Sequence, residues 1–141
     1  MQPQTGFMRC SRCGKCCEET EMLLSRADMS RLEKAGHDLE GFARLDKQGY
    51  VRLRNRKGYC VFFDPRKSRC TVYRNRPSGC RVYPVIQSEG EGAIVDDVCP
   101  MRHTVTRSEL ERKGRRVARL LKRIDREARN ACLSHERVKQ S

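Results

Sequence analysis

A chain of 141 residues is the usual length of one compact domain, but only 37% of these residues are apolar and none is Trp, so we expect a thin core. No apolar run is long enough to cross a bilayer or to form the core of an export signal, which argues against a membrane protein and favours the cytoplasm. Thirty-one Lys and Arg against 18 Asp and Glu give a formal net charge of +13, which favours an anionic partner, most commonly nucleic acid.

The first predicted element is a short helix that begins after Ser25. Ser25 is a typical N-cap residue, and Met29 and Leu32 give the helix one apolar stripe, which we expect to face the core. Two short strands, or a loose hairpin, are predicted next at 50–54 and 59–63, because the first of these segments alternates with period two.

Turns and a short extended piece are predicted to follow. Residues 64–68 form a turn, residues 70–73 are extended, and the glycines at 90 and 92 mark a further turn. Pro77 is placed to open a single helical turn that carries Cys80.

A long helix is predicted from Thr106, which forms a capping-box signature with Glu109. Gly114 inside this helix indicates a bend or a close packing contact. The apolar residues recur on one face, and they are Leu110, Val117, Leu120, Leu121, Ile124 and Ala128.

Nine cysteines carry the strongest chemical signal, because clustered thiols in a reducing cytosol are more often metal ligands than disulfide partners. Cys10, Cys13 and Cys16 follow the pattern C-x2-C-x2-C, and Cys17 comes directly after them. A C-x2-C loop turns two sulfurs toward one point. Adjacent Cys16 and Cys17 point in different directions, so they face different centres, or one of them lies behind the ligands. Thiolate–metal bonds would also help to stabilise a thin core.

Two arrangements of the metal remain open. In the first, Cys10, Cys13 and Cys16 bind a [4Fe–4S] cluster, and Cys99, followed by Pro100, supplies the fourth ligand. In the second, four-cysteine zinc sites are assembled from pairs, and the eight thiolates before residue 100 suffice for two such sites.

The dispersed cysteines also have a simpler interpretation as small buried apolar residues. It applies best to Cys60, which lies in an apolar strand, and less to Cys70, Cys80 and Cys99 in polar, turn-rich surroundings. Cys132 follows the apolar face of the long helix, so we expect it to pack rather than to bind metal.

The opening Cys10-x2-Cys13-x2-Cys16-Cys17 is followed by Cys60-Val-Phe and by Cys70-x2-Tyr73-x2-Arg76-Pro77-x2-Cys80-x2-Tyr83-Pro84. Together these motifs resemble the YkgJ-type cysteine-cluster proteins, which share a CxxCxxCC opening and are described as zinc- or iron-chelating domains. One relative, flagellin lysine N-methylase, implies that the domain can belong to a protein-modifying enzyme. The resemblance spans about residues 10–103 and implies a metal site whose ligands are Cys10, Cys13, Cys16, Cys17, Cys60, Cys70 and Cys80, with Cys99 as a late member.

Residues beside the ligands can tune such a site. Pro77 is expected to make rigid the turn that aims Cys80, and Arg76 either offsets thiolate charge or is a solvated cation. His103 follows Cys99 at a spacing seen in zinc fingers, but it is more simply a solvent-facing or capping residue.

The C-terminal segment is strongly basic. Residues 104–141 hold 12 Lys and Arg against 5 Asp and Glu, a net charge of +7. These cations predict salt-dependent contacts with the phosphates of RNA or DNA, without sequence specificity, because the segment lacks aromatic residues that could stack on bases. The alternative is a solvated face with ion pairs such as Glu111 with Arg115.

The sequence therefore predicts an α+β fold, with a small irregular metal-stabilised domain of short strands at 1–105 and a long basic helix at 106–141. The predicted function is a metal-binding module whose zinc or [4Fe-4S] cluster is structural or redox-sensing, and whose basic surface contacts RNA, a ribonucleoprotein or an acidic protein. The alternative is an enzyme, either an iron–sulfur redox protein or a protein-modifying enzyme related to flagellin lysine N-methylase. No nucleophile–base pairing, phosphate loop or hydride-cofactor motif in the sequence identifies a reaction.

Overall fold

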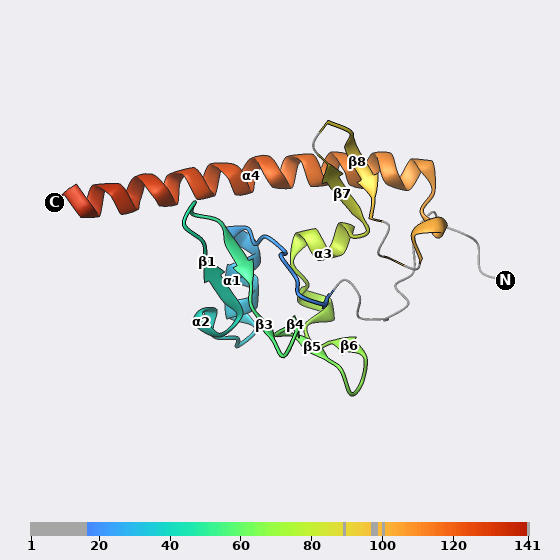
Figure 1. Cartoon of the computed structure of the whole chain (residues 1–141), viewed down its shortest axis with the longest axis horizontal. Helices are drawn as coiled ribbons and strands as arrows, with labels where there is room; N and C mark the ends of the chain where they lie inside the picture. Colours follow the sequence, from blue (N-terminus) through green and yellow to red (C-terminus); the bar gives the residue numbers. More distant parts are fainter. Residues whose placement is uncertain (1–16, 89, 97–98, 100, 141) are drawn as a thin grey trace.

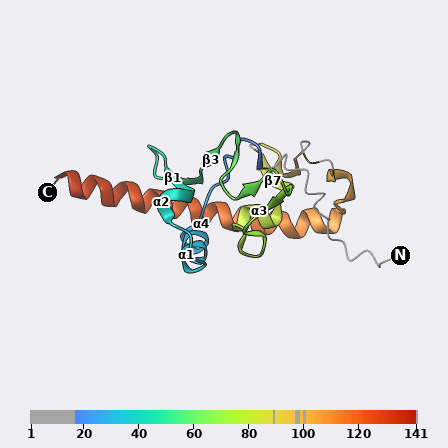
Figure 2. The same ribbon diagram turned by 90° about the horizontal axis from the view of Figure 1, so that it is seen from below.

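The computed structural model describes residues 17–88, 90–96, 99 and 101–140, and within them side chains up to residue 131 (Figure 1). Short helices and two-stranded sheets precede one long helix, α4 (Arg107–Gln140). Figures 1 and 2 show that α4 runs along the length of the molecule, with α1 (Arg26–Lys34) and α2 (Leu39–Phe42) on one side of it. The fold is α+β, as predicted.

All the described strands belong to antiparallel sheets of two strands each. The pairs are β1 (Ala43–Leu45) with β2 (Val51–Leu53), β3 (Asn55–Arg56) with β4 (Tyr59–Cys60), β5 (Phe63–Asp64) with β6 (Arg69–Cys70), and β7 (Val85–Ser88) with β8 (Gly92–Val95). Each strand pairs with its neighbour in the chain, so the hairpins follow one another without a crossover.

Of the two strands predicted at 50–54 and 59–63, the first exists as β2, whereas the second is divided, because β4 ends at Cys60 and β5 begins at Phe63. Strands β2 and β4 do not form one hairpin. Strand β2 pairs with the preceding β1, and β4 forms a separate hairpin with β3. Lys57 and Gly58 connect that hairpin with φ angles of 54° and 84°, the positive values that a tight two-residue hairpin turn requires. The expected extended piece at 70–73 is also interrupted, because the 3₁₀ helix η2 (Tyr73–Asn75) follows β6.

Helix α1 begins where the sequence predicts. The Ser25 hydroxyl accepts a hydrogen bond from the backbone N–H of Asp28 at 3.1 Å, and the Asp28 carboxylate accepts one from the backbone N–H of Ser25 at 3.1 Å. This reciprocal capping box satisfies backbone donors that a helix start leaves without partners. Leu32 is completely buried, so the predicted apolar stripe does face the core.

The main core lies among α1, α2 and the first three hairpins. Phe62 anchors it, with its ring centroid 5.6 Å from that of Phe42 and 5.1 Å from that of His37. The buried members of this cluster are Leu24, Leu32, Phe42, Ala43, Leu53, Cys60, Phe62 and Val72. A cysteine is therefore part of the packed interior.

A second core lies beneath the first half of α4. Val117 of α4 is buried against Val82 of α3 (Ser78–Val82) and Val85 of β7. A Cβ added at Gly114 would lie 2.6 Å from the Cβ of Ala93, so this glycine marks a close packing contact with β8. Such a contact is one of the two explanations that the sequence offers for Gly114.

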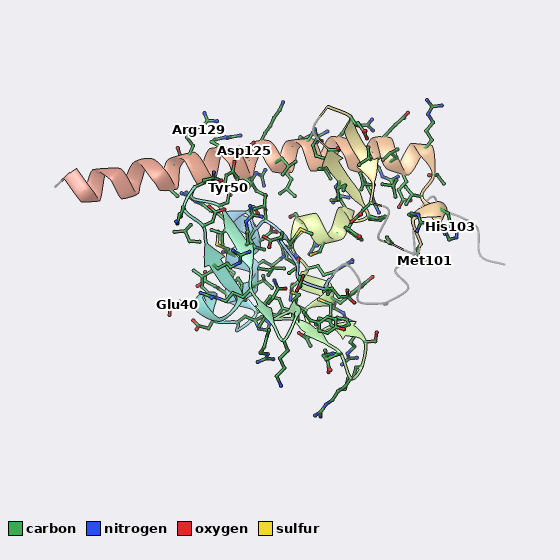
Figure 3. The ribbon with its side chains drawn as sticks, in the orientation of Figure 1. Glu40, Tyr50, Met101, His103, Asp125 and Arg129 are labelled. Carbon is green, nitrogen blue, oxygen red and sulfur yellow. The ribbon has the colours of Figure 1, made fainter. Side chains whose placement is uncertain are left out.

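Polar contacts tie the second half of α4 to the N-terminal part of the chain. The Tyr50 hydroxyl donates to the Asp125 carboxylate at 2.5 Å, and the backbone N–H of Arg26 donates to the Glu127 carboxylate at 2.8 Å. Figure 3 shows Tyr50 directed at α4, beside Asp125 and Arg129. None of the helices in the described residues has an apolar stretch that could span a membrane.

Candidate metal centre

Five of the eight predicted ligands lie in the described part of the chain. Cys60 ends β4, Cys70 ends β6, and Cys80 lies in the middle of α3. Cys17 is the first described residue, and Cys99 lies between β8 and the 3₁₀ helix η3 (Arg102–Thr104). Three predicted ligands lie outside the described residues, namely Cys10, Cys13 and Cys16.

Four cysteines from four segments of the chain belong to the main core or pack against it. Cys60 is 6% exposed and is one of its buried members. Cys17, Cys70 and Cys80 are half-buried and pack against the same cluster. The fold therefore gathers four of the five described ligands around one core.

Backbone pairing brings Cys17 to the strand that carries Cys60. Glu18 forms an antiparallel bridge with Tyr59, and the N–H of Glu19 donates to the carbonyl of Gly58 at 2.8 Å. In an antiparallel register, the residue before Glu18 faces the residue after Tyr59. Cys17, the last cysteine of the CxxCxxCC run, thus enters the fold beside Cys60.

The described thiols do not form a complete site by themselves. Among the residues that the structure describes, no three side chains of His, Cys, Asp or Glu lie close enough together to hold a metal ion. The rest of the predicted ligand set is Cys10, Cys13 and Cys16, which directly precede Cys17 in the sequence. Thiolates are the ligands preferred by zinc and by iron in iron–sulfur clusters, so the chemistry of the gathered donors fits either metal.

Cys99 has a different environment. It is buried, but it is not a member of the core cluster against which the other four described cysteines pack. Its carbonyl accepts hydrogen bonds from the backbone N–H and the guanidinium of Arg102, both at 3.1 Å. His103 is exposed on η3 and lies at the end of the molecule away from Tyr50 (Figure 3). Pairing of Cys99 with the early cysteines therefore stays a prediction.

A polar junction that the sequence does not reveal holds the segment carrying Cys80. Asp28 of α1 is completely buried, and its Oδ1 atom accepts hydrogen bonds from the backbone N–H of Ser78 at 3.0 Å and from the Ser78 hydroxyl at 2.9 Å. The Arg31 guanidinium donates to the same oxygen at 2.8 Å and to the carbonyl of Arg76 at 2.8 Å. The sequence does not reveal this contact, because Asp28 and Ser78 lie 50 residues apart in the chain.

Arg76 and Pro77 occupy defined positions at this junction. The Arg76 guanidinium carbon lies 3.8 Å above the centroid of the Tyr73 ring, and its Nε atom donates to the Tyr73 carbonyl at 2.9 Å. Arg76 is thus held against Tyr73. Pro77 is the N-cap of α3, which confirms the predicted helical turn around Cys80.

Helix α4 presents a surface of unbalanced positive charge. Its described carboxylates all take part in internal contacts, namely Glu109 with Lys113, Glu111 with Arg107, Asp125 with Tyr50, and Glu127 with the backbone of Arg26. The alternative pair of Glu111 with Arg115 is replaced by the pair with Arg107, at 3.7 Å. Six exposed cations of α4 have no carboxylate of the described residues within ion-pair distance. They are here called the outer cations, and they are Arg115, Arg116, Arg119, Lys122, Arg123 and Arg126.

Comparison with protein families connects this arrangement to metal binding. Residues 9–100 match the family model CxxCxxCC, which is described as "Putative zinc- or iron-chelating domain". The matched range covers more than half of the chain, contains all eight predicted ligands, and excludes Cys132 and α4. Neither the curated proteins nor the solved structures contain a significant match to the chain.

Proposed function

The chain belongs to the CxxCxxCC family of zinc- or iron-chelating domains, and we propose that it is a metal-binding module with a composite thiolate site. The gathering of Cys17, Cys60, Cys70 and Cys80 at one core carries this proposal. The segment that ends at Cys17 then adds its three earlier cysteines to the thiols of the folded body. Cys99 is the eighth candidate, and it serves a second centre or the fourth position of a [4Fe–4S] cluster.

The metal has a structural role in this proposal. Sheets of only two strands are marginally stable on their own, and three of them contribute to the core against which these cysteines pack. Thiolate–metal bonds that form only in the folded state contribute their binding free energy to folding. An iron–sulfur centre at the same thiols would make the module a redox sensor, since loss of the cluster would loosen the hairpins.

Anaerobic purification followed by elemental analysis and visible absorption spectroscopy tests the proposal. Cys70→Ser and Cys80→Ser are the informative variants, because both thiols are half-buried and replacing them disturbs the core less than replacing Cys60. Cys132→Ser is the matched control outside the family match. We expect stoichiometric zinc or iron in the wild type and in the control, and loss of metal in both test variants.

The outcomes separate the alternatives. Colourless protein with zinc identifies a structural thiolate site and rejects the cluster. Visible absorbance with iron and sulfide identifies an iron–sulfur centre, and reversible reduction by an electron donor would then favour a redox protein. A wild type without bound metal, or variants that keep the full metal content, would overturn the proposed site.

We further propose that the outer cations of α4 give this module a surface for RNA or a ribonucleoprotein. Support comes from the internal contacts of the described carboxylates on α4, which leave the positive charge of the outer face unbalanced. Exposed cations that meet phosphates release counterions, so the affinity should fall steeply as salt rises.

Charge reversal on two surfaces tests this contact. Arg119→Glu combined with Lys122→Glu should weaken binding to a labelled RNA. The slope of log affinity against log salt concentration should fall by the contribution of about two phosphate contacts. Arg66→Glu combined with Lys67→Glu, in the exposed turn between β5 and β6, is the control with the same net charge. Equal weakening by both double variants would show an effect of net charge alone. Binding of an acidic protein but not of RNA would identify the other class of partner.

A further inference from the structure

The buried carboxylate of Asp28 lies at the junction between α1 and the segment that carries Cys80. Its Oδ1 atom accepts three hydrogen bonds, two from Ser78 and one from Arg31, while its Oδ2 atom accepts the bond from Ser25. The two oxygens therefore act on different parts of the chain, because Oδ2 completes the start of its own helix and Oδ1 holds a residue 50 positions further along.

Ser78 is the first residue of α3, and Cys80 follows two positions later. Helix α3 has five residues, and its N-cap, Pro77, makes no side-chain capping bond. Asp28 supplies that missing acceptor from another helix, since it binds the N–H of Ser78 directly. The backbone N–H of Cys80 donates in turn to the Pro77 carbonyl at 3.0 Å, so the orientation of Cys80 depends on how this first turn is held.

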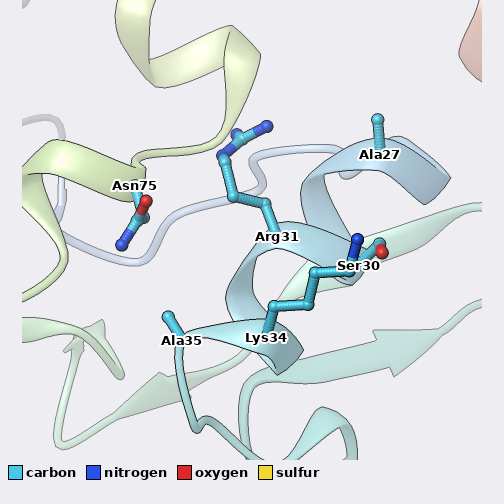
Figure 4. Close-up of a pocket in the computed structure, with 6 residues that line it drawn as sticks. All are labelled: Ala27, Ser30, Arg31, Lys34, Ala35 and Asn75. Atoms are coloured by element: carbon cyan, nitrogen blue, oxygen red, sulfur yellow. The ribbon is translucent and has the colours of Figure 1, made fainter.

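Guanidinium groups hold the segment of the chain that leads into this first turn of α3. Arg31 donates to the Arg76 carbonyl at 2.8 Å, and Arg81 donates to that carbonyl at 3.1 Å and to the Arg74 carbonyl at 3.1 Å. Figure 4 shows Arg31 on one wall of an open groove, with Asn75 of η2 on the other. Arg31 lines this groove, whereas Asp28 is completely buried, and the polar contacts of both residues connect α1 to the chain leading to Cys80.

We infer that Asp28 is a positioning residue for the metal centre, which aims the Cys80 thiol at the other cysteines by holding Ser78. This inference rests on the proposed function, because it assigns Asp28 a role toward the thiolate site. Residues that orient metal ligands through hydrogen bonds typically change metal affinity by roughly 10- to 100-fold when they are removed. A carboxylate that only stabilised α1 would not act on one particular ligand.

Three variants separate positioning from simple stabilisation. Asp28→Asn keeps the side-chain volume but removes the charge and one of the two acceptor oxygens. Ser78→Ala removes the hydroxyl donor at the junction and leaves the cap of α1 intact. Ser25→Ala removes the cap of α1 and leaves the contact between Asp28 and Ser78, so it is the matched control for lost helix stability.

The experiment measures Co²⁺ binding to the metal-free, reduced chain, together with the absorption bands that report how many thiolates bind the ion. The rate of alkylation at Cys80, followed by mass spectrometry in the presence of Co²⁺, is the second readout. We expect Asp28→Asn and Ser78→Ala to bind Co²⁺ about 10-fold or more weakly, with Cys80 alkylated faster, and Ser25→Ala to match the wild type in both measurements.

Two failures are distinguishable. A wild type that does not bind Co²⁺ contradicts the proposed function itself. A wild type that binds Co²⁺, with Asp28→Asn and Ser78→Ala showing the same affinity, spectrum and Cys80 alkylation, leaves the metal site in place and overturns the role of Asp28. An equal effect of Ser25→Ala would likewise overturn it, because it would assign the change to helix stability.

Discussion

Tyr50 and Asp125 join two parts of the molecule that are 75 residues apart in the sequence, through a hydrogen bond of 2.5 Å from phenol to carboxylate. The hydrogen bond to Asp125 raises the pKa of Tyr50 above its ordinary value of 10.0, and burial and the negative charge of Asp125 act in the same direction. The bond thus holds the second half of α4 against the loop that precedes β2.

Tyr50→Phe removes this donor and keeps the ring. We expect a loss of about 1 kcal/mol in unfolding free energy at neutral pH, since the bond is exposed to solvent. A raised pKa in the folded state means that the bond contributes below about pH 10 and is lost as pH rises through the folded value. Chemical denaturation of both proteins across alkaline pH checks the sign, because the difference between them should vanish there. A difference that grows with pH would contradict the assignment.

Asp46 is expected to make the stability of the β1–β2 hairpin depend on pH in the acidic range. Burial acts to raise the pKa of Asp46, but hydrogen bonds from the backbone N–H groups of Tyr50 and Gln48 and from Arg52 outweigh it and lower the pKa below 3.8. A group whose pKa is lowered in the folded state stabilises the fold at pH values above its unfolded-state pKa. This stability is lost as the pH falls through the folded-state pKa.

Asp46→Asn should therefore cost about 1 kcal/mol at neutral pH and progressively less below about pH 4. Asp38→Asn is the control, because Asp38 stands at the N-cap of α2 without a side-chain capping bond. Thermal melts at several pH values check the prediction. A constant penalty from neutral to acidic pH would exclude the charge of Asp46 as its cause.

Gly114 is expected to be required by packing rather than by backbone conformation. Gly114→Ala adds a methyl group 2.6 Å from the Cβ of Ala93, and this overlap should outweigh the gain in helix propensity and cost about 1–3 kcal/mol. Adding Ala93→Gly should restore most of the loss, because it removes the opposing atom. Gly41→Ala is the matched control, since its nearest neighbour lies at an ordinary 3.9 Å. Absence of rescue would disprove the close contact between α4 and β8.

The buried pair of Glu109 and Lys113 should behave unlike the exposed pair of Arg107 and Glu111. The Lys113 ammonium lies 2.9 Å from the Glu109 carboxylate, and both side chains are largely or fully buried. Lys113→Ala leaves a buried carboxylate without this cation, so we expect a loss of about 3 kcal/mol. Arg107→Ala should change stability by less than about 0.5 kcal/mol, because both partners are exposed. Denaturant titrations compare them, and similar losses would refute the distinction.

The elements that the sequence predicted well depend on local signals. Ser25 and Thr106 cap helices whose apolar residues recur with the helical period, so cap and stripe indicate the same structure for α1 and α4. The pairing of the strands was harder to predict, because strands of two or three residues are too short for their alternating pattern to identify the strand with which each one pairs. Lys57-Gly58 was the missed signal, since a glycine in a two-residue connection favours a hairpin.

In the candidate site, too, the features with local sequence signals were predictable, and those that depend on distant contacts were not. The spacing of the cysteines predicts metal binding, which the family match supports, whereas the choice of ligands among them stays a prediction. That Cys17, Cys60, Cys70 and Cys80 lie at one core depends on contacts between distant segments. The contact of Asp28 with Ser78 could not be predicted, because helix caps are local patterns whereas this bond depends on the packing of distant segments. The different surroundings of Cys99 were hidden for the same reason.

The series of separate hairpins has a consequence for cooperativity. No ladder of hydrogen bonds runs through the described strands from one sheet to the next, so the opening of one hairpin does not strip partners from its neighbours. In the metal-free chain, amide hydrogen exchange should therefore be fast and uneven across β3–β6, and slow where α4 covers β7 and β8. Bound metal would slow exchange in the β3–β4 and β5–β6 hairpins together, because Cys60 and Cys70, one from each hairpin, would then open only as a unit.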